Sequence, residues 1–176
     1  MIGTTVAARA PADGRTLLVT SFGFTANPFM VANLPYKPGA LEPLAMIAVA
    51  PAVLFVHPSV PADDVPSLVR YMRSSVKPLS FASSGNGSSP HIGAELFASQ
   101  IGVPIVHVPY RGNGPGLNDL IGGQVEFGVA ALPSVQAHIK SGALRAIGAC
   151  GAQRTAAAPD IPTFVEQGLS GYVMDA

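Results

Sequence analysis

Charged residues are scarce in this sequence of 176 residues. They make up 11% of it, with ten basic residues balanced by ten acidic ones, whereas an average soluble domain has about 25%. The Lys and Arg residues are scattered along the chain, so they form no basic stripe that would release counterions from a phosphate backbone. We therefore expect no nucleic-acid partner.

The sequence also lacks a long apolar run, a cysteine pair and a recognisable leader. Its longest apolar run, 44–56, is interrupted by Pro51 and falls short of the roughly 18 residues that a membrane span needs. Cys150 is the only cysteine, so no internal disulfide can form, and we expect it as a small buried residue at the end of a strand. Residues 1–9 show no basic segment followed by an apolar core, which indicates either a cytoplasmic protein or a chain whose first part is missing.

Apolar segments that alternate with helical patterns are what the sequence does contain. The mostly continuous apolar runs predict strands covered on both faces, at 16–20, 52–56, 79–82, 105–108, 125–130 and 144–149. Apolar residues at spacings of three or four predict helices at 66–74, 90–100, 115–121 and 134–140. This order predicts an α/β fold with a doubly wound parallel sheet, in which ligands bind at the carboxyl ends of the strands.

The segment 83–91, Ser-Ser-Gly-Asn-Gly-Ser-Ser-Pro-His, follows one of these strands and opens a helix. Gly85 and Gly87 allow positive φ, Ser88 or Ser89 can cap the helix, and Pro90 suits its first position. Such a helix start presents free N–H groups and a positive dipole end to an anion. The alternative is an ordinary strand-to-helix connection, which also favours Gly, Ser and Pro.

Three other predicted strands run into polar segments of similar composition, at 21–28, 109–115 and 131–134. In a doubly wound sheet these loops meet at one rim. They offer hydroxyls, backbone amides and one arginine, but few groups that can act as a general acid or base. This composition indicates recognition of a small molecule more than catalysis.

A series of short motifs resembles one family along nearly the whole chain. The motifs are 83–91, Val-His-Val-Pro-Tyr-Arg-Gly at 106–112, Gly-Gly-Gln-Val at 122–125, Leu-Pro-Ser at 132–134, His-Ile-Lys-Ser-Gly at 138–142 and Pro-Asp-Ile-Pro-Thr at 159–163. In this order they resemble the extracytoplasmic solute receptors of tripartite tricarboxylate transporters, the Bug family.

This resemblance implies a fold, a ligand and partners. The fold is that of type II periplasmic binding proteins, with two α/β lobes that close on a small carboxylated solute. In that family, loop amides, hydroxyls and ordered water hold the ligand, and the receptor delivers it to a membrane permease in the periplasm. The resemblance implies no cofactor and no enzymatic activity.

The chain departs from the family pattern in two ways. It lacks the family's first strand and C-terminal continuation, so we expect a complete lobe at 57–148 and an incomplete first lobe at 1–56 with 149–176. Apolar surface is then expected to be exposed around 17–19 and 44–56, where a second copy, as a homodimer, can cover it. Ala130 and Ala131 stand where many relatives have an acidic residue, which argues against amino-acid ligands.

The expected ligand-binding residues come from these loops, and for three of them the sequence leaves a structural role open. His91 can contact a carboxylate or only bond to a neighbouring loop, Tyr110 can line the cleft or cap the core, and Arg111 can neutralise an anion or bind a loop carbonyl. His57 and His107 have no partners at metal-ligand spacing, so we expect structural roles and no metal site. The complete set is Ser21, Thr25, Ser83, Ser84, Gly85, Asn86, Gly87, Ser88, Ser89, His91, Tyr110, Arg111, Gly112 and Ala130.

Two other classes of function remain as alternatives. Ser88 or Ser89 with His91 suggests a hydrolase, but the sequence has no Gly-x-Ser-x-Gly elbow, and residues so close at a helix start point in different directions. The other alternative is the ligand-sensing effector domain of a regulator, which shares the two-lobed fold but is accompanied by a helix-turn-helix that these 176 residues lack. The glycines match neither the dinucleotide nor the Walker fingerprint.

Overall fold

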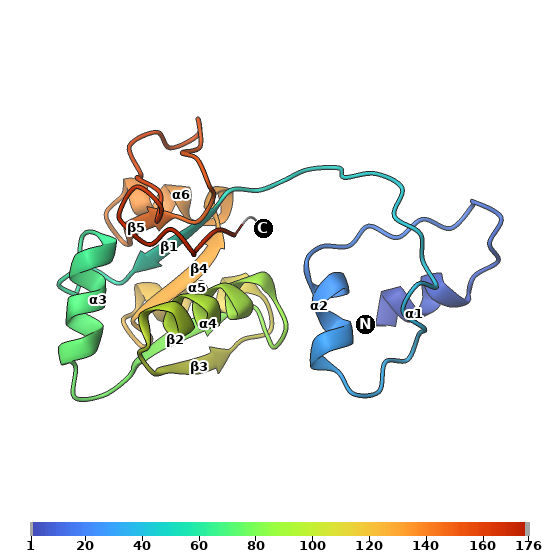
Figure 1. The fold of residues 1–176 in the computed structure, drawn as a ribbon, viewed down its shortest axis with the longest axis horizontal. Helices are drawn as coiled ribbons and strands as arrows, with labels where there is room; N and C mark the ends of the chain where they lie inside the picture. The colour runs from blue at the N-terminus through green and yellow to red at the C-terminus, as the bar shows by residue number, and fades with distance from the viewer. Residues whose placement is uncertain (1, 175–176) are drawn as a thin grey trace. The chain divides into compact units, whose positions relative to one another are not determined.

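The computed structural model describes residues 2–174, which form two compact units divided between Ala48 and Val49 (Figure 1). The second unit contains a five-stranded sheet in the order β3-β2-β4-β1-β5. Its elements, in chain order, are β1 (Ala52–Val56), α3 (Val65–Ser74), β2 (Leu79–Ser83), α4 (Ser89–Ile101), β3 (Ile105–Pro109), α5 (Asn113–Ile121), β4 (Phe127–Ala131), α6 (Leu132–Lys140) and β5 (Arg145–Ala149).

Four of the five strands run in the same direction. β2 pairs in parallel with β3 and β4, whereas β1 is antiparallel to both of its neighbours, β4 and β5. The predicted parallel arrangement is confirmed for four strands, and β1 is the one strand of this sheet that runs the other way. A strand that is buried on both faces has the same apolar pattern in either direction, so its sequence does not reveal the reversal. The loops after β2, β3 and β4 nevertheless lie at one edge, as predicted.

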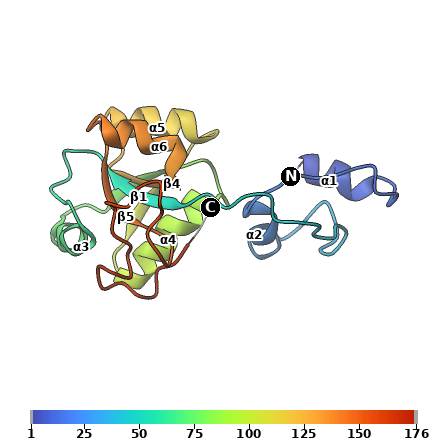
Figure 2. The same ribbon diagram turned by 90° about the horizontal axis from the view of Figure 1, so that it is seen from above.

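Helices cover both faces of the sheet (Figure 2). α3 and α4 pack on one face against Leu54, Phe81 and Phe127, and α5 and α6 pack on the other against Val53 and Phe55. Neighbouring residues of a strand thus enter different cores, as the alternation of side chains along a strand requires. This three-layer arrangement brings the first turns of α4, α5 and α6 to the carboxyl edge of β2, β3 and β4.

The segment after β5 also packs on this sheet. Phe164 and Tyr172 are fully buried and contact the ring of Phe97 on α4, with centroids 5.6 and 5.9 Å from it. Residues 149–176 are expected to join 1–56 in a partial first lobe, whereas β1 and the described residues after β5 belong to the second compact unit. Their assignment to the lobes of a complete receptor stays a prediction.

The first unit contains two helices, α1 (Ile2–Arg9) and α2 (Gly23–Met30). The predicted strand 16–20 does not form: these residues have no regular secondary structure, and residues 2–48 contain no strand that could pair with them. The ring of Tyr36 stacks on Phe24 at 6.1 Å, and its hydroxyl accepts a hydrogen bond from Asn27 Nδ2 at 3.3 Å. Tyr36 is the one apolar side chain of residues 2–48 that is buried.

Apolar side chains are exposed in the two predicted places. Leu17 and Val19 are 69% and 76% exposed, and Leu44, Met46 and Ile47 are 80%, 81% and 78% exposed. The prediction is wrong only for 52–56, since this part of the expected range is β1 and is buried on both faces. Exposed apolar surface of this kind marks an interaction site or a liability for aggregation.

The start of α3 provides a prediction about stability. Asp64 caps the helix by accepting hydrogen bonds from the hydroxyl and, at 2.7 Å, the amide of Ser67. We expect Asp64→Ala to lower the free energy of unfolding by about 1 kcal/mol, the usual effect of losing a cap. Urea unfolding at neutral pH measures this difference, and Asp160→Ala, in an exposed loop, serves as the control.

The same cap gives the protein a pH dependence. Hydrogen bonds from the Ser67 hydroxyl, and then from its amide, hold the pKa of Asp64 below its ordinary value. The stabilisation is therefore present above the ordinary carboxyl pKa and is lost as the pH falls through the lowered one. An Asp64→Ala effect that stays equally large in strong acid would contradict this origin.

Candidate functional site

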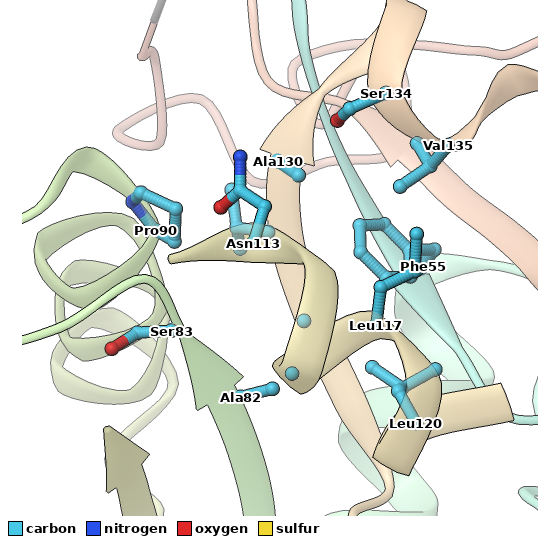
Figure 3. A pocket seen from close by; sticks show the side chains of 13 residues that line it. Phe55, Ala82, Ser83, Pro90, Asn113, Leu117, Leu120, Ala130, Ser134 and Val135 are labelled. Atoms are coloured by element: carbon cyan, nitrogen blue, oxygen red, sulfur yellow. The ribbon is translucent and has the colours of Figure 1, made fainter. Parts of the chain in front are cut away.

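The loops after β2, β3 and β4 surround one pocket (Figure 3). Each loop leads into a helix, and the first turns of α4, α5 and α6 contribute Pro90, Asn113 and Ser134 to the pocket wall. Figure 3 shows Asn113 beside Pro90 and Ala130. The other lining residues are Phe55, Ala82, Ser83, Gly116, Leu117, Leu120, Gly128, Val129 and Val135.

The pocket is uncharged and small. Its polar side chains are Ser83, Asn113 and Ser134, and no acidic or basic side chain is among the lining residues. The Ser134 hydroxyl donates to the carbonyl of Ala131 at 2.7 Å. The cavity volume is about 30 Å³, enough for one or two water molecules. A cavity of this size does not enclose a small organic ligand by itself.

The loop 84–88 has the backbone that the sequence predicts. Gly85 and Gly87 have φ values of 120° and 76°, which side chains strongly disfavour. Ser88 is the N-cap of α4, but its hydroxyl donates to the Gly85 carbonyl at 2.6 Å and caps no helix amide. Pro90 takes the second position of the helix, one residue later than predicted.

Several amides of this loop are free to bind an anion. The amides of Asn86, Ser89 and His91 have no hydrogen-bond partner among residues 2–174. Two other amides are occupied, because Gly85 donates to Ser83 Oγ at 3.1 Å and Gly87 donates to His91 Nδ1 at 3.2 Å. The loop thus combines fixed glycine amides with neighbouring amides that lack a partner.

Two histidines lie behind this loop. His91 and His107 stack with ring centroids 4.0 Å apart, and the ring of Phe81 stacks on both, 4.8 Å from His107 and 6.4 Å from His91. His107 Nε2 lies 2.6 Å from the buried hydroxyl of Ser83. Of the two roles left open for His91, the structure shows a bond to the neighbouring loop, and contact with a ligand stays a prediction.

The environment of His107 predicts an acid-sensitive stability. Burial, and then the nearby His91, lowers the pKa of His107 from its ordinary 6.5. The unfolded chain therefore binds a proton at a higher pH than the native state, and the protein loses stability as the pH falls through this range. We expect the melting temperature to fall between about pH 7.5 and about pH 5.5, and to fall less in His107→Gln, which keeps an amide near Nε2 but does not titrate.

Differential scanning fluorimetry at both pH values measures this effect. His138→Gln, on the exposed side of α6, is the matched control and should retain the full decrease. If His107→Gln and the unmodified chain show the same pH dependence, the lowered pKa of His107 is not its source.

The residues after β3 have more structural partners than the sequence predicts. The Tyr110 hydroxyl donates to Asp119 Oδ2 on α5 at 2.6 Å. Burial and this hydrogen bond raise the pKa of Tyr110 to about 12. The Tyr110 ring packs against Gly116. A Cβ added at position 116 would lie 3.0 Å from Cδ2 of this ring, so a residue larger than glycine would crowd the tyrosine. Arg111 is exposed, and Gly112 caps α5 with a φ of 101°.

The predicted site residues are distributed unevenly. Ser83 and Ala130 line the pocket, whereas Ser21 and Thr25 belong to the first unit, where both are exposed and the Thr25 hydroxyl donates to the Phe22 carbonyl at 2.8 Å. Asn113 and Ser134 line the pocket but are not among the predicted residues. The signal for them was present, because both lie in the polar segments that follow predicted strands.

The serines and histidine of the hydrolase alternative do not form a nucleophile and base. The Ser88 hydroxyl donates to a loop carbonyl, and His91 Nδ1 accepts from Gly87. The short Ser83–His107 contact has the distance of such a pair, but Ser83 is 4% exposed and its Oγ already accepts from Gly85.

Within residues 2–174, no cluster of three or more His, Cys, Asp or Glu side chains forms a metal site. None of the described helices is both long and apolar enough to cross a membrane.

Comparison with known proteins identifies similar sequences. Residues 1–176 match the family described as tripartite tricarboxylate transporter family receptor. A UPF0065 protein of Bordetella pertussis is 40% identical over 162 residues, which are 92% of this chain and 50% of that protein. BugT of the same organism is 34% identical over 176 residues, which are 98% of this chain and 54% of BugT. The chain spans about half the length of these relatives.

Solved structures with the same fold include two that contain a named ligand. Rpa4515 of R. palustris with adipate has a TM-score of 0.88 and 32% identity, over 99% of this chain and 59% of that one. MatC from Rhodopseudomonas palustris with bound malate has a TM-score of 0.87 and 28% identity, over 99% and 60% of the two chains. The periplasmic binding protein BugD has a TM-score of 0.87 and 29% identity, over 99% and 58%.

Proposed function

Because the chain belongs to the tripartite tricarboxylate transporter receptor family, we propose that it binds a small carboxylate in the periplasm and delivers it to a membrane permease. The observation that carries this proposal is the uncharged pocket at which α4, α5 and α6 begin. In this role the protein performs no chemistry on the solute.

The electrostatics of the pocket favour a negative group. Each helix N-terminus stabilises a nearby anion by about 0.3–1 kcal/mol, and each amide that donates to a charged acceptor adds about 1.5–3 kcal/mol. The free amides of Asn86 and Ser89 lie at the start of α4 and supply such donors. No acidic side chain lines the pocket to repel a carboxylate.

The absence of acidic side chains from the pocket wall also argues against ligands that carry an ammonium group. An amino acid brings an ammonium group, which needs an acceptor of negative charge, and Ala130 with its neighbours provides none in the pocket wall. The similar structures with adipate and malate contain plain dicarboxylates. We therefore propose a di- or tricarboxylate, or an aromatic acid, as the solute.

The proposed site extends beyond the pocket wall. In the second unit it comprises the 12 residues predicted there from the sequence together with Asn113 and Ser134, and Ser21 and Thr25 of the first unit stay predictions. A ligand larger than the 30 Å³ cavity needs a second wall, which the other lobe of a receptor would supply. The ligand then shifts the equilibrium toward the closed state only through contacts that it makes in that state. A second copy of the chain, as a homodimer, is a further proposed partner for the exposed apolar residues.

Titration calorimetry tests this function directly. Malate, adipate and citrate are titrated into the protein beside aspartate and glutamate, and hydrolysis of a generic ester is assayed in parallel. We expect binding of plain carboxylates and no turnover. Tighter binding of glutamate than of every plain carboxylate would overturn the ligand class, and ester turnover that His91→Phe abolishes would support the hydrolase alternative.

A further inference from the structure

The two histidines behind the loop have a geometry that the proposed function does not yet use. We propose that His91 and His107 are positioning residues, which fix the amides of Gly87 and Gly85 and thereby hold the free amides of the loop in place for a carboxylate. This proposal rests on the proposed function for its ligand, but its structural part can be measured without one.

His107 acts on the Gly85 amide through the hydroxyl of Ser83. His107 Nε2 lies 2.6 Å from Ser83 Oγ, which in turn accepts from the Gly85 amide at 3.1 Å. Ser83 is 4% exposed, so its hydroxyl has little access to water, and the imidazole at 2.6 Å is a closer partner for it than the Gly85 carbonyl at 3.3 Å. His107 therefore acts on the loop through one buried hydroxyl.

His91 contacts the Gly87 amide directly. His91 Nδ1 accepts from the Gly87 amide at 3.2 Å, and an acceptor nitrogen carries no proton in neutral imidazole. The ring proton of His91 is therefore assigned to Nε2, the nitrogen that faces Glu95 Oε1 at 4.0 Å. A proton added to Nδ1 would remove the acceptor of Gly87.

The two histidine rings are in contact with each other. The His91 and His107 rings are 4.0 Å apart with 16° between their planes, and Phe81 supports the stack from the sheet. Because Gly85 and Gly87 flank Asn86, fixing both glycines also fixes the peptide plane that carries the free amide of Asn86. No other residue of the described chain bonds the amide of either glycine.

Two variants of His91 separate positioning from packing. His91→Phe keeps an aromatic ring on His107 but has no acceptor, whereas His91→Asn places an amide oxygen near the position of Nδ1. We expect His91→Phe to weaken malate or adipate binding by about tenfold or more, since it leaves the Gly87 amide without its partner. His91→Asn should restore most of the affinity, and His138→Phe, on α6, should leave it unchanged.

Nuclear magnetic resonance tests the structural part independently of the ligand. In the unmodified chain we expect His91 as the Nε2–H tautomer, and faster hydrogen exchange of the Gly87 amide in His91→Phe but not in His91→Asn. A protonated Nδ1 at neutral pH, or a Gly87 amide that exchanges equally in all variants, would overturn the proposal. If the unmodified chain shows this tautomer and protection but binds no carboxylate, the proposed function fails and the positioning role in the loop remains.

Discussion

Gly87→Val is expected to abolish detectable carboxylate binding, while Gly142→Val leaves it intact. Both glycines have nearly the same positive φ, 76° and 77°, so a branched side chain imposes a similar strain of about 1–3 kcal/mol at each. Gly87 lies in the loop that supplies the free amides, and Gly142 lies in the turn after α6. Relief of the strain at position 87 requires the loop to leave the geometry that binds the anion.

The two variants share the backbone strain but differ in burial, because Gly87 is buried whereas Gly142 is exposed. Urea unfolding therefore reports the stability of each variant, and titration calorimetry with malate or adipate reports the affinity of the folded protein. If Gly87→Val binds as well as Gly142→Val, the loop is an ordinary turn and the anion is bound elsewhere.

Phe81→Ala is expected to produce the largest loss of stability. Phe81 is fully buried on β2, and its ring contacts Phe127 at 5.4 Å and His107 at 4.8 Å. Removal of a buried phenylalanine side chain typically costs about 3–5 kcal/mol, a large part of the roughly 5–15 kcal/mol by which a domain is stable. The ring also supports the histidine stack, so the amide of Gly87 should lose protection as well.

Equilibrium unfolding in urea measures the first effect, and hydrogen exchange measures the second. Val76→Ala, at a position that is 99% exposed, is the control for removing apolar atoms and should change stability by less than about 0.5 kcal/mol. A Phe81→Ala variant that is no less stable than Val76→Ala would show that β2 is not part of a packed core.

Much of the second unit could be predicted from apolar patterning. The strands β2, β3 and β5 and the helices α3 to α6 begin and end within two residues of their predicted bounds, because strands buried on both faces and amphipathic helices have distinct periods. The direction of β1 could not be predicted, since the pattern of a doubly buried strand is symmetric. The expected strand 16–20 did not form, since a strand requires a partner that local sequence does not supply.

The site shows the same division between local and non-local information. Positive φ at Gly85 and Gly87 followed from residue type alone. The contact between Ser83 and His107 depends on the register of β2 against β3, which pairs Phe81 with His107 and Ser83 with Pro109. Since no feature of either strand alone determines that register, the contact between the two residues could not be predicted.

The position of β1 has a consequence for how the protein folds during synthesis. β1 is made first among the strands of its sheet, yet its two neighbours are Phe127–Ala131 and Arg145–Ala149, the last strands to be made. Contacts between residues so distant in sequence close slowly. A nascent chain that ends before β4 therefore carries the apolar segment Ala52–Val56 without either of its partners, and we expect folding of the sheet to wait until Ala149 has left the ribosome.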